Sequence, residues 1–139
     1  MKLTTSFGQI NLIATNIAEV IINNNIEITL EIVDEYDVLM AKHFTQNYAL
    51  LVNRINSYSF SYEALLCVAS AQNLKALALI NYRAENEQQT QNLKSARHMD
   101  NLNIKEFLGL ELGRENAIKW LNEQLTNANK NQTTTSPYH

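Results

Sequence analysis

Two apolar runs, each of the length of a β-strand, stand in the middle of the chain. They are residues 48–52 (YALLV) and residues 74–80 (LKALALI). A strand with one face in water alternates between apolar and polar residues, whereas a strand covered on both faces is apolar throughout. The pattern therefore predicts two neighbouring central strands of a sheet whose faces are covered by helices.

Segments with apolar residues at helical spacing flank these strands. Thr29 is a candidate N-cap for the first helix, and Ser59 and Ser61 are candidates for the second, because a side-chain oxygen there accepts an amide proton of the first turn. The third helix has few apolar residues, so we expect it to be the most exposed. Trp120 in the last helix is expected in the core. The four predicted helices cover residues 29–43, 61–69, 86–99 and 113–126.

Three further segments predict strands. Gln9–Ala14 and Ile17–Ile22 indicate a β-hairpin, and Asn103–Leu108 indicates an edge strand. Strands that alternate with helices favour right-handed crossovers and a mostly parallel sheet, so we predict an α/β fold with about five strands, an N-terminal β-hairpin and four helices. This single domain covers residues 1–126. Residues 127–139 are polar and low in complexity, which predicts a disordered tail.

Composition narrows the choice of partners. A net charge of -3 offers no basic surface for phosphates and argues against nucleic acid. No apolar run is long enough to span a bilayer, and the first residues lack the apolar core of a signal peptide, so we expect a soluble, cytoplasmic protein without integral membrane association. The single cysteine, Cys67, and three scattered histidines argue against a metal site. We expect no cofactor.

The candidate binding surface lies at the ends of the two central strands. In open α/β sheets, ligands bind beyond the carboxyl ends of the strands. These ends carry two cations together with aromatic and amide side chains, which would suit a small anionic or amphipathic, lipid-like ligand. Ordinary solvated loops are the alternative interpretation. The residues concerned are Asn53, Arg54, Tyr58, Ser59, Asn81, Tyr82 and Arg83.

Several segments together resemble one known family. They are the helix start ITLEIVDEYD from Ile28, the strand YALLV with Asn53 after it, the turn Ser61-Tyr62-Glu63-Ala64, the strand ALALI, and Phe107 followed by AIKWL from Ala117. In this order and at this chain length they resemble the STAS or SpoIIAA-like proteins, the anti-sigma-factor antagonists. The resemblance covers roughly residues 7–125 and is closest to bacterial STAS/Sec14-like proteins of unassigned function.

The resemblance implies a regulatory module that recognises a protein partner. In the anti-sigma-factor antagonists, a kinase phosphorylates a serine in an Asp-Ser-Ser-Gly motif at the start of a helix. The matching positions here are Phe60, Ser61, Tyr62 and Glu63, so Ser61 is the candidate phosphoacceptor. The aspartate and the glycine of the motif are replaced, and Glu63 would repel a phosphate in the same turn.

The leading hypothesis is therefore a non-enzymatic regulatory or protein-interaction module. The alternative is a binder of a small anionic or amphipathic ligand at the strand ends. The chain has no Gly-x-Ser-x-Gly, no glycine-rich phosphate loop and no His-Glu-x-x-His, and Cys67 has no base beside it in the sequence, so we predict no enzyme activity. The hairpin and the strand 103–108 are both candidate sheet edges, through which a homodimer could form.

Overall fold

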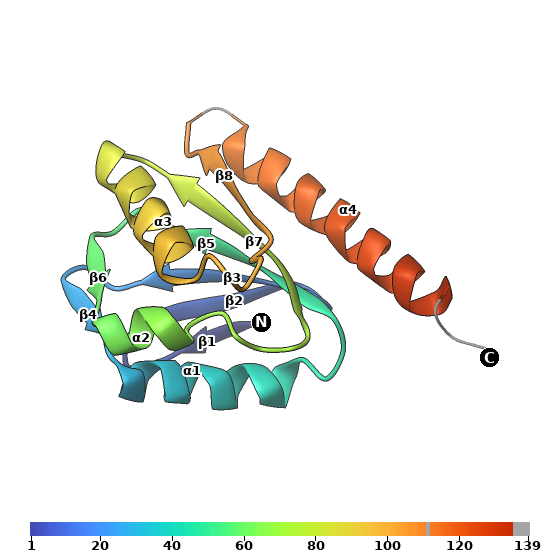
Figure 1. Cartoon of the computed structure of the whole chain (residues 1–139), viewed down its shortest axis with the longest axis horizontal. Coiled ribbons are helices and arrows are strands. Elements are labelled where there is room, and N and C mark those ends of the chain that lie inside the picture. Colours follow the sequence, from blue (N-terminus) through green and yellow to red (C-terminus); the bar gives the residue numbers. More distant parts are fainter. Residues whose placement is uncertain (111, 135–139) are drawn as a thin grey trace.

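The two predicted central strands form the middle of the sheet. In the computed structural model, which describes residues 1–110 and 112–134, they are β5 (Tyr48–Asn53) and β7 (Leu74–Asn81). They run parallel, with Leu50 opposite Leu77 (Figure 1). Residues 48–51 and 76–81 are all buried, as expected for strands covered on both faces. The predicted pair of central strands is confirmed.

The rest of the sheet extends from this pair in both directions. The predicted hairpin is β2 (Gly8–Ala14) and β3 (Ile17–Ile22), and β3 continues the sheet parallel to β5. The predicted edge strand is β8 (Ile104–Leu108), parallel to β7. The described residues form six strands in this sheet, in the order β1-β2-β3-β5-β7-β8. The additional strand, β1 (Lys2–Thr4), pairs antiparallel with β2.

The helices cover the two faces of the sheet unequally. Three of them connect the parallel strands β3, β5, β7 and β8, which follow one another across the sheet in the order of the chain. Right-handed crossovers between strands in this order place all three helices on the same face of the sheet. The alternation along β5 agrees, because Leu50 belongs to the apolar cluster of this face and Leu51 to the cluster beneath α4. In Figure 1, α4 is separated from α1 by the sheet. The helices are α1 (Leu30–His43), α2 (Tyr62–Cys67), α3 (Ala84–Ala96) and α4 (Gly113–Thr134).

The last helix is longer than predicted. Under it the sheet presents small side chains, among them Ala49, Ala76 and Ala78, against which Leu121 and Leu125 pack. The tail predicted to be disordered from position 127 starts instead as the continuation of α4, because extending a helix that is already anchored costs little per residue. The remainder of the predicted tail, 135–139, lies outside the described residues.

Two predicted caps are present. Thr29 Oγ1 accepts a hydrogen bond from the Ile32 amide at 3.4 Å, and Ser61 Oγ accepts one from the Ala64 amide at 3.2 Å. The second helix ends at Cys67, two residues earlier than predicted, and Ala69 has a left-handed backbone with φ of 59°. Among the described helices, none has the length and hydropathy needed to cross a membrane.

A small second sheet lies beside α2. It consists of β4 (Ile26–Ile28) and β6 (Tyr58–Phe60), which pair in parallel. These two short strands were not predicted from the sequence. They draw the loop after β5 toward the chain segment before α1, and this arrangement brings Tyr58 and Phe60 over the sheet face that α1, α2 and α3 cover.

Candidate ligand-binding site

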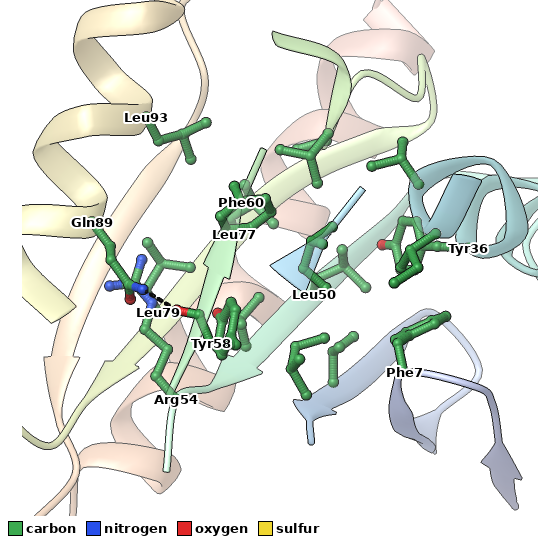
Figure 2. A pocket seen from close by; sticks show the side chains of 18 residues that line it. Phe7, Tyr36, Leu50, Arg54, Tyr58, Phe60, Leu77, Leu79, Gln89 and Leu93 are labelled. Carbon is green, nitrogen blue, oxygen red and sulfur yellow. Dashed lines mark hydrogen bonds between the residues drawn. The ribbon is translucent and has the colours of Figure 1, made fainter. Parts of the chain in front are cut away.

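A cavity of about 100 Å³ lies between the sheet and the three helices on that face. The sheet contributes Val20, Leu50 and Leu77 to its wall, and Phe60 and Leu93 come from β6 and α3 (Figure 2). The walls are almost entirely apolar. Because α2 has only six residues, it covers less of the sheet than a longer helix would, and side chains from β4, β6 and the loop after α2 complete the enclosure.

One end of the cavity carries a buried cation. Arg54 follows β5 directly and is only 4% exposed. Its Nη1 donates to Asn81 Oδ1 at 3.3 Å and to the main-chain oxygen of Asn86 at 2.5 Å. Burial lowers the pKa of the guanidinium, but an arginine keeps its charge in proteins. In the part of the chain that the structure describes, no carboxylate lies within 4.0 Å of this guanidinium.

The absence of an ion-pair partner for Arg54 is energetically unusual. A buried charge is costly unless an opposite charge and hydrogen bonds compensate for it. Arg54 has neutral hydrogen-bond partners from β7 and α3, and these hold its side chain in a fixed position at the cavity. Glu106, which Asn81 links to Arg54, favours the charged guanidinium, but its effect does not outweigh burial. The arrangement is suited to an anionic group that arrives from outside the chain, because such a group would pair directly with the guanidinium.

Tyr58 completes the polar end. Burial raises the pKa of its phenol, although the nearby positive charge of Arg54 acts in the opposite direction, so the group is a neutral hydroxyl at physiological pH. Gln89 Nε2 donates to the main-chain oxygen of Tyr58 at 2.6 Å, which ties β6 to α3 (Figure 2). A neutral hydroxyl beside a guanidinium gives this end two adjacent polar groups, the small number that ligand pockets usually provide.

The predicted surface residues separate into two groups. Arg54 and Tyr58 line the cavity, and Asn81 contacts Arg54. Tyr82 and Arg83 lie at the end of β7 but do not line the cavity. Arg83 Nη2 instead donates to the main-chain oxygen of Ile55 at 2.7 Å, and its guanidinium is 3.6 Å from a carboxylate oxygen of Glu85. The strand ends therefore converge as expected, but they do not form one continuous surface.

Two other predicted residues lie elsewhere. Ser59 is exposed on β6. Asn53 donates from Nδ2 to Glu19 Oε2 at 3.1 Å, within a polar cluster that includes Arg114 of α4. Successive residues of a strand point to opposite faces, so Asn53 lies on the α4 side while Arg54 lies at the cavity. Ser61 caps α2, and Phe60 beside it lines the cavity.

Glu19 and Arg114 fix α4 to the opposite face of the sheet. Arg114 Nη2 lies 2.8 Å from Glu19 Oε1, and the Glu19 side chain is 6% exposed. Burial alone would raise the pKa of the Glu19 carboxyl, but hydrogen bonds from Arg114 and Asn53, together with the positive charge of Arg114, outweigh burial and lower it below its usual value. The folded state therefore favours the ionised form.

The depressed pKa of Glu19 predicts an acid-sensitive contribution to stability. Protonation favours the unfolded chain, so the contribution is complete above the unfolded-state pKa of about 4.3 and is lost as the pH falls through the lower folded-state pKa. We expect Glu19→Gln to reduce the free energy of unfolding by about 2 kcal/mol at neutral pH, the value of charged hydrogen bonds. Urea unfolding at neutral and acidic pH measures this. The exposed Glu115, changed to Gln, is the control; equal losses in both variants would contradict the assignment.

Several cavity residues had no functional role in the sequence analysis. Tyr36 belonged to the apolar stripe of the first helix, and Val20 belonged to the hairpin. The sequence did carry a signal for the inward face of α3. Polar residues that recur at three- and four-residue spacing on a helix with few apolar residues can form its inward face. These residues are Asn86 and Thr90, which are buried, and Gln89, which lines the cavity. The predicted exposed helix is thus held largely through polar contacts.

Comparison with known proteins adds no assignment. No protein-family model matches the chain, and no curated protein or solved structure is significantly similar to it. Within residues 1–110 and 112–134, no three histidine, cysteine, aspartate or glutamate side chains are grouped so that they could hold a metal ion.

Proposed function

We propose that the protein binds a small amphipathic carboxylate, with its apolar part in the cavity and its carboxylate at Arg54. The observation that carries this proposal is the buried Arg54 guanidinium, which lines an apolar cavity and has no carboxylate within 4.0 Å among the described side chains. This proposal develops the alternative hypothesis of a small anionic or amphipathic ligand, and Arg54 and Tyr58 are the cavity residues that were predicted for that ligand. The groups that line the cavity favour binding rather than catalysis, so we propose a non-enzymatic role.

The size of the cavity limits the ligand. An apolar cavity of about 150 Å³ in another protein accommodates benzene, so about 100 Å³ corresponds to roughly four or five carbon atoms. Burial of each methylene contributes about 0.8 kcal/mol, which is about a fourfold gain in affinity. A short linear or branched carboxylate therefore fits better than a long-chain lipid.

Ligand binding is compatible with the regulatory role that the family resemblance implies. Phe60 and Val68 line the cavity and flank α2, the helix that corresponds to the phosphorylated region in the anti-sigma-factor antagonists. A ligand in the cavity would contact residues on both sides of this helix. The STAS-like identity, a protein partner and phosphorylation of Ser61 stay predictions. The last has less support, because Ser61 Oγ already caps the helix.

A series of linear carboxylates from acetate to octanoate tests the proposal. We expect affinity, measured by calorimetry or by NMR titration, to rise about fourfold with each methylene until the cavity is filled, at about pentanoate or hexanoate, and then to stop rising. Hexan-1-ol should bind more weakly than hexanoate, because it cannot supply an anion to Arg54. An affinity independent of chain length would contradict the proposal.

A cavity-filling variant provides a second test. Val20 is 5% exposed and lines the cavity, whereas Val38 is 72% exposed on α1. We expect Val20→Phe to weaken hexanoate binding at least tenfold, because the added ring occupies the space of the ligand, and Val38→Phe to leave binding unchanged. Filling a cavity typically changes stability by only about 1 or 2 kcal/mol, so unfolding measurements will show whether Val20→Phe remains folded.

A further inference from the structure

A further polar group at the cavity is the Tyr36 hydroxyl. Tyr36 lies on α1 and lines the cavity, and its Oη atom is buried without a hydrogen-bond partner in the part of the chain that the structure describes. Buried hydroxyl groups in proteins nearly always have a partner, so an unpaired one requires an explanation. Figure 2 shows the Tyr36 oxygen directed away from α1 and toward Leu50, across the cavity from Arg54.

We infer that the ligand carries a hydrogen-bond acceptor near its apolar end and that the Tyr36 hydroxyl donates to it. This inference rests on the proposed function, because it assumes that the carboxylate of the ligand lies at Arg54. The chemical class is then a short oxo or hydroxy carboxylate whose second oxygen is remote from the carboxylate. An oxygen there would satisfy the hydroxyl, whereas a plain alkyl chain would leave it unpaired.

The chemistry of Tyr36 suits a donor role. Burial, with smaller contributions from Tyr48 and Asp37, raises the pKa of its phenol well above the usual value, so the group keeps its proton at neutral pH. The ring is held on the inner side of α1, where Val33 and Met40 are buried. A fixed, protonated hydroxyl facing an apolar space discriminates between ligands with and without an acceptor, because water does not compete there.

A cycle of two ligands and two proteins tests the inference. Hexanoate and 5-oxohexanoate have similar lengths but differ in the acceptor, and Tyr36→Phe removes only the hydroxyl. For each protein we take the ratio of its affinity for 5-oxohexanoate to its affinity for hexanoate. We expect this ratio to be about 3- to 10-fold higher in the wild type than in Tyr36→Phe, which is the value of one neutral hydrogen bond. The 4-oxo isomer and 6-hydroxyhexanoate test whether the acceptor position matters.

The variants also separate a ligand-binding role from a structural one. Without ligand, Tyr36→Phe should be at least as stable as the wild type, because it removes a buried hydroxyl that has no partner. Tyr62, 69% exposed on α2, provides the control Tyr62→Phe, which should alter neither binding nor stability. A loss of stability in Tyr36→Phe, or equal ligand preferences in both proteins for every acceptor tested, would overturn the inference. If hexanoate itself failed to bind, the proposed function would fail as well.

Discussion

Replacement of Arg54 by Met should weaken hexanoate binding by about 10- to 100-fold, the range expected for loss of a charged hydrogen bond, while it changes the free energy of unfolding by no more than about 1 kcal/mol. Binding weakens because the carboxylate loses the only cation that lines the cavity among the described residues. Stability is retained because methionine is apolar and replaces the aliphatic part of the arginine side chain, and replacing buried charges by apolar side chains is often neutral or stabilising.

The contacts of Arg54 support this division between binding and stability. The main-chain oxygen of Asn86, which accepts from Arg54, also accepts from Thr90 Oγ1 at 3.2 Å, and the Asn81 amide also donates to Glu106. After the substitution the Asn86 oxygen keeps Thr90 as its donor and the Asn81 amide nitrogen keeps Glu106 as its acceptor, so only Asn81 Oδ1 loses its donor. Arg83→Met is the matched control, because Arg83 is a neighbouring cation outside the cavity. Equal binding by wild type and Arg54→Met would disprove the role of Arg54.

The second large effect concerns the fold. Leu51 on β5 is fully buried beneath α4, so Leu51→Ala should reduce the free energy of unfolding by about 3 kcal/mol, as for other buried leucines. Leu110 is 75% exposed, and Leu110→Ala should change stability by less than about 0.5 kcal/mol. Urea denaturation of both variants measures the difference.

The same variant distinguishes the two faces of the sheet. The cavity lies on the face of α1, α2 and α3, whereas Leu51 faces α4. Leu51→Ala should therefore leave hexanoate affinity unchanged under conditions in which the protein is folded. If Leu51→Ala reduced the free energy of unfolding by less than about 1 kcal/mol, this side of β5 would not be packed as described, because truncation of a buried leucine costs more.

The sequence contained the signals for the central layers of the fold. The apolar runs at 48–52 and 74–80 have the length and the continuous apolar character of covered strands, and Thr29 and Ser61 marked helix starts through their capping chemistry. The strands β1, β4 and β6 were not predicted, because each has three residues. A segment of that length has no measurable period, and its pairing depends on partners distant in sequence.

The candidate site was predictable only in part. Parallel strands end at one edge, so the proximity of Arg54 and Asn81 followed from the predicted topology. The alternation of side chains along a strand was a signal that Asn53 and Arg54 lie on opposite faces of the sheet. The cavity itself depends on how α2 and the pair β4–β6 cover the sheet. Packing between side chains that are distant in the chain produces no local pattern in the sequence, so the cavity could not be predicted from it.

The most direct test of the central claim is an NMR measurement of intermolecular nuclear Overhauser effects between hexanoate and the methyl groups of the protein. The binding proposal predicts contacts from the alkyl chain to Val20, Leu50 and Leu77, which line the cavity. Contacts confined to exposed leucines such as Leu108 and Leu110, or none at concentrations that saturate binding, would contradict it.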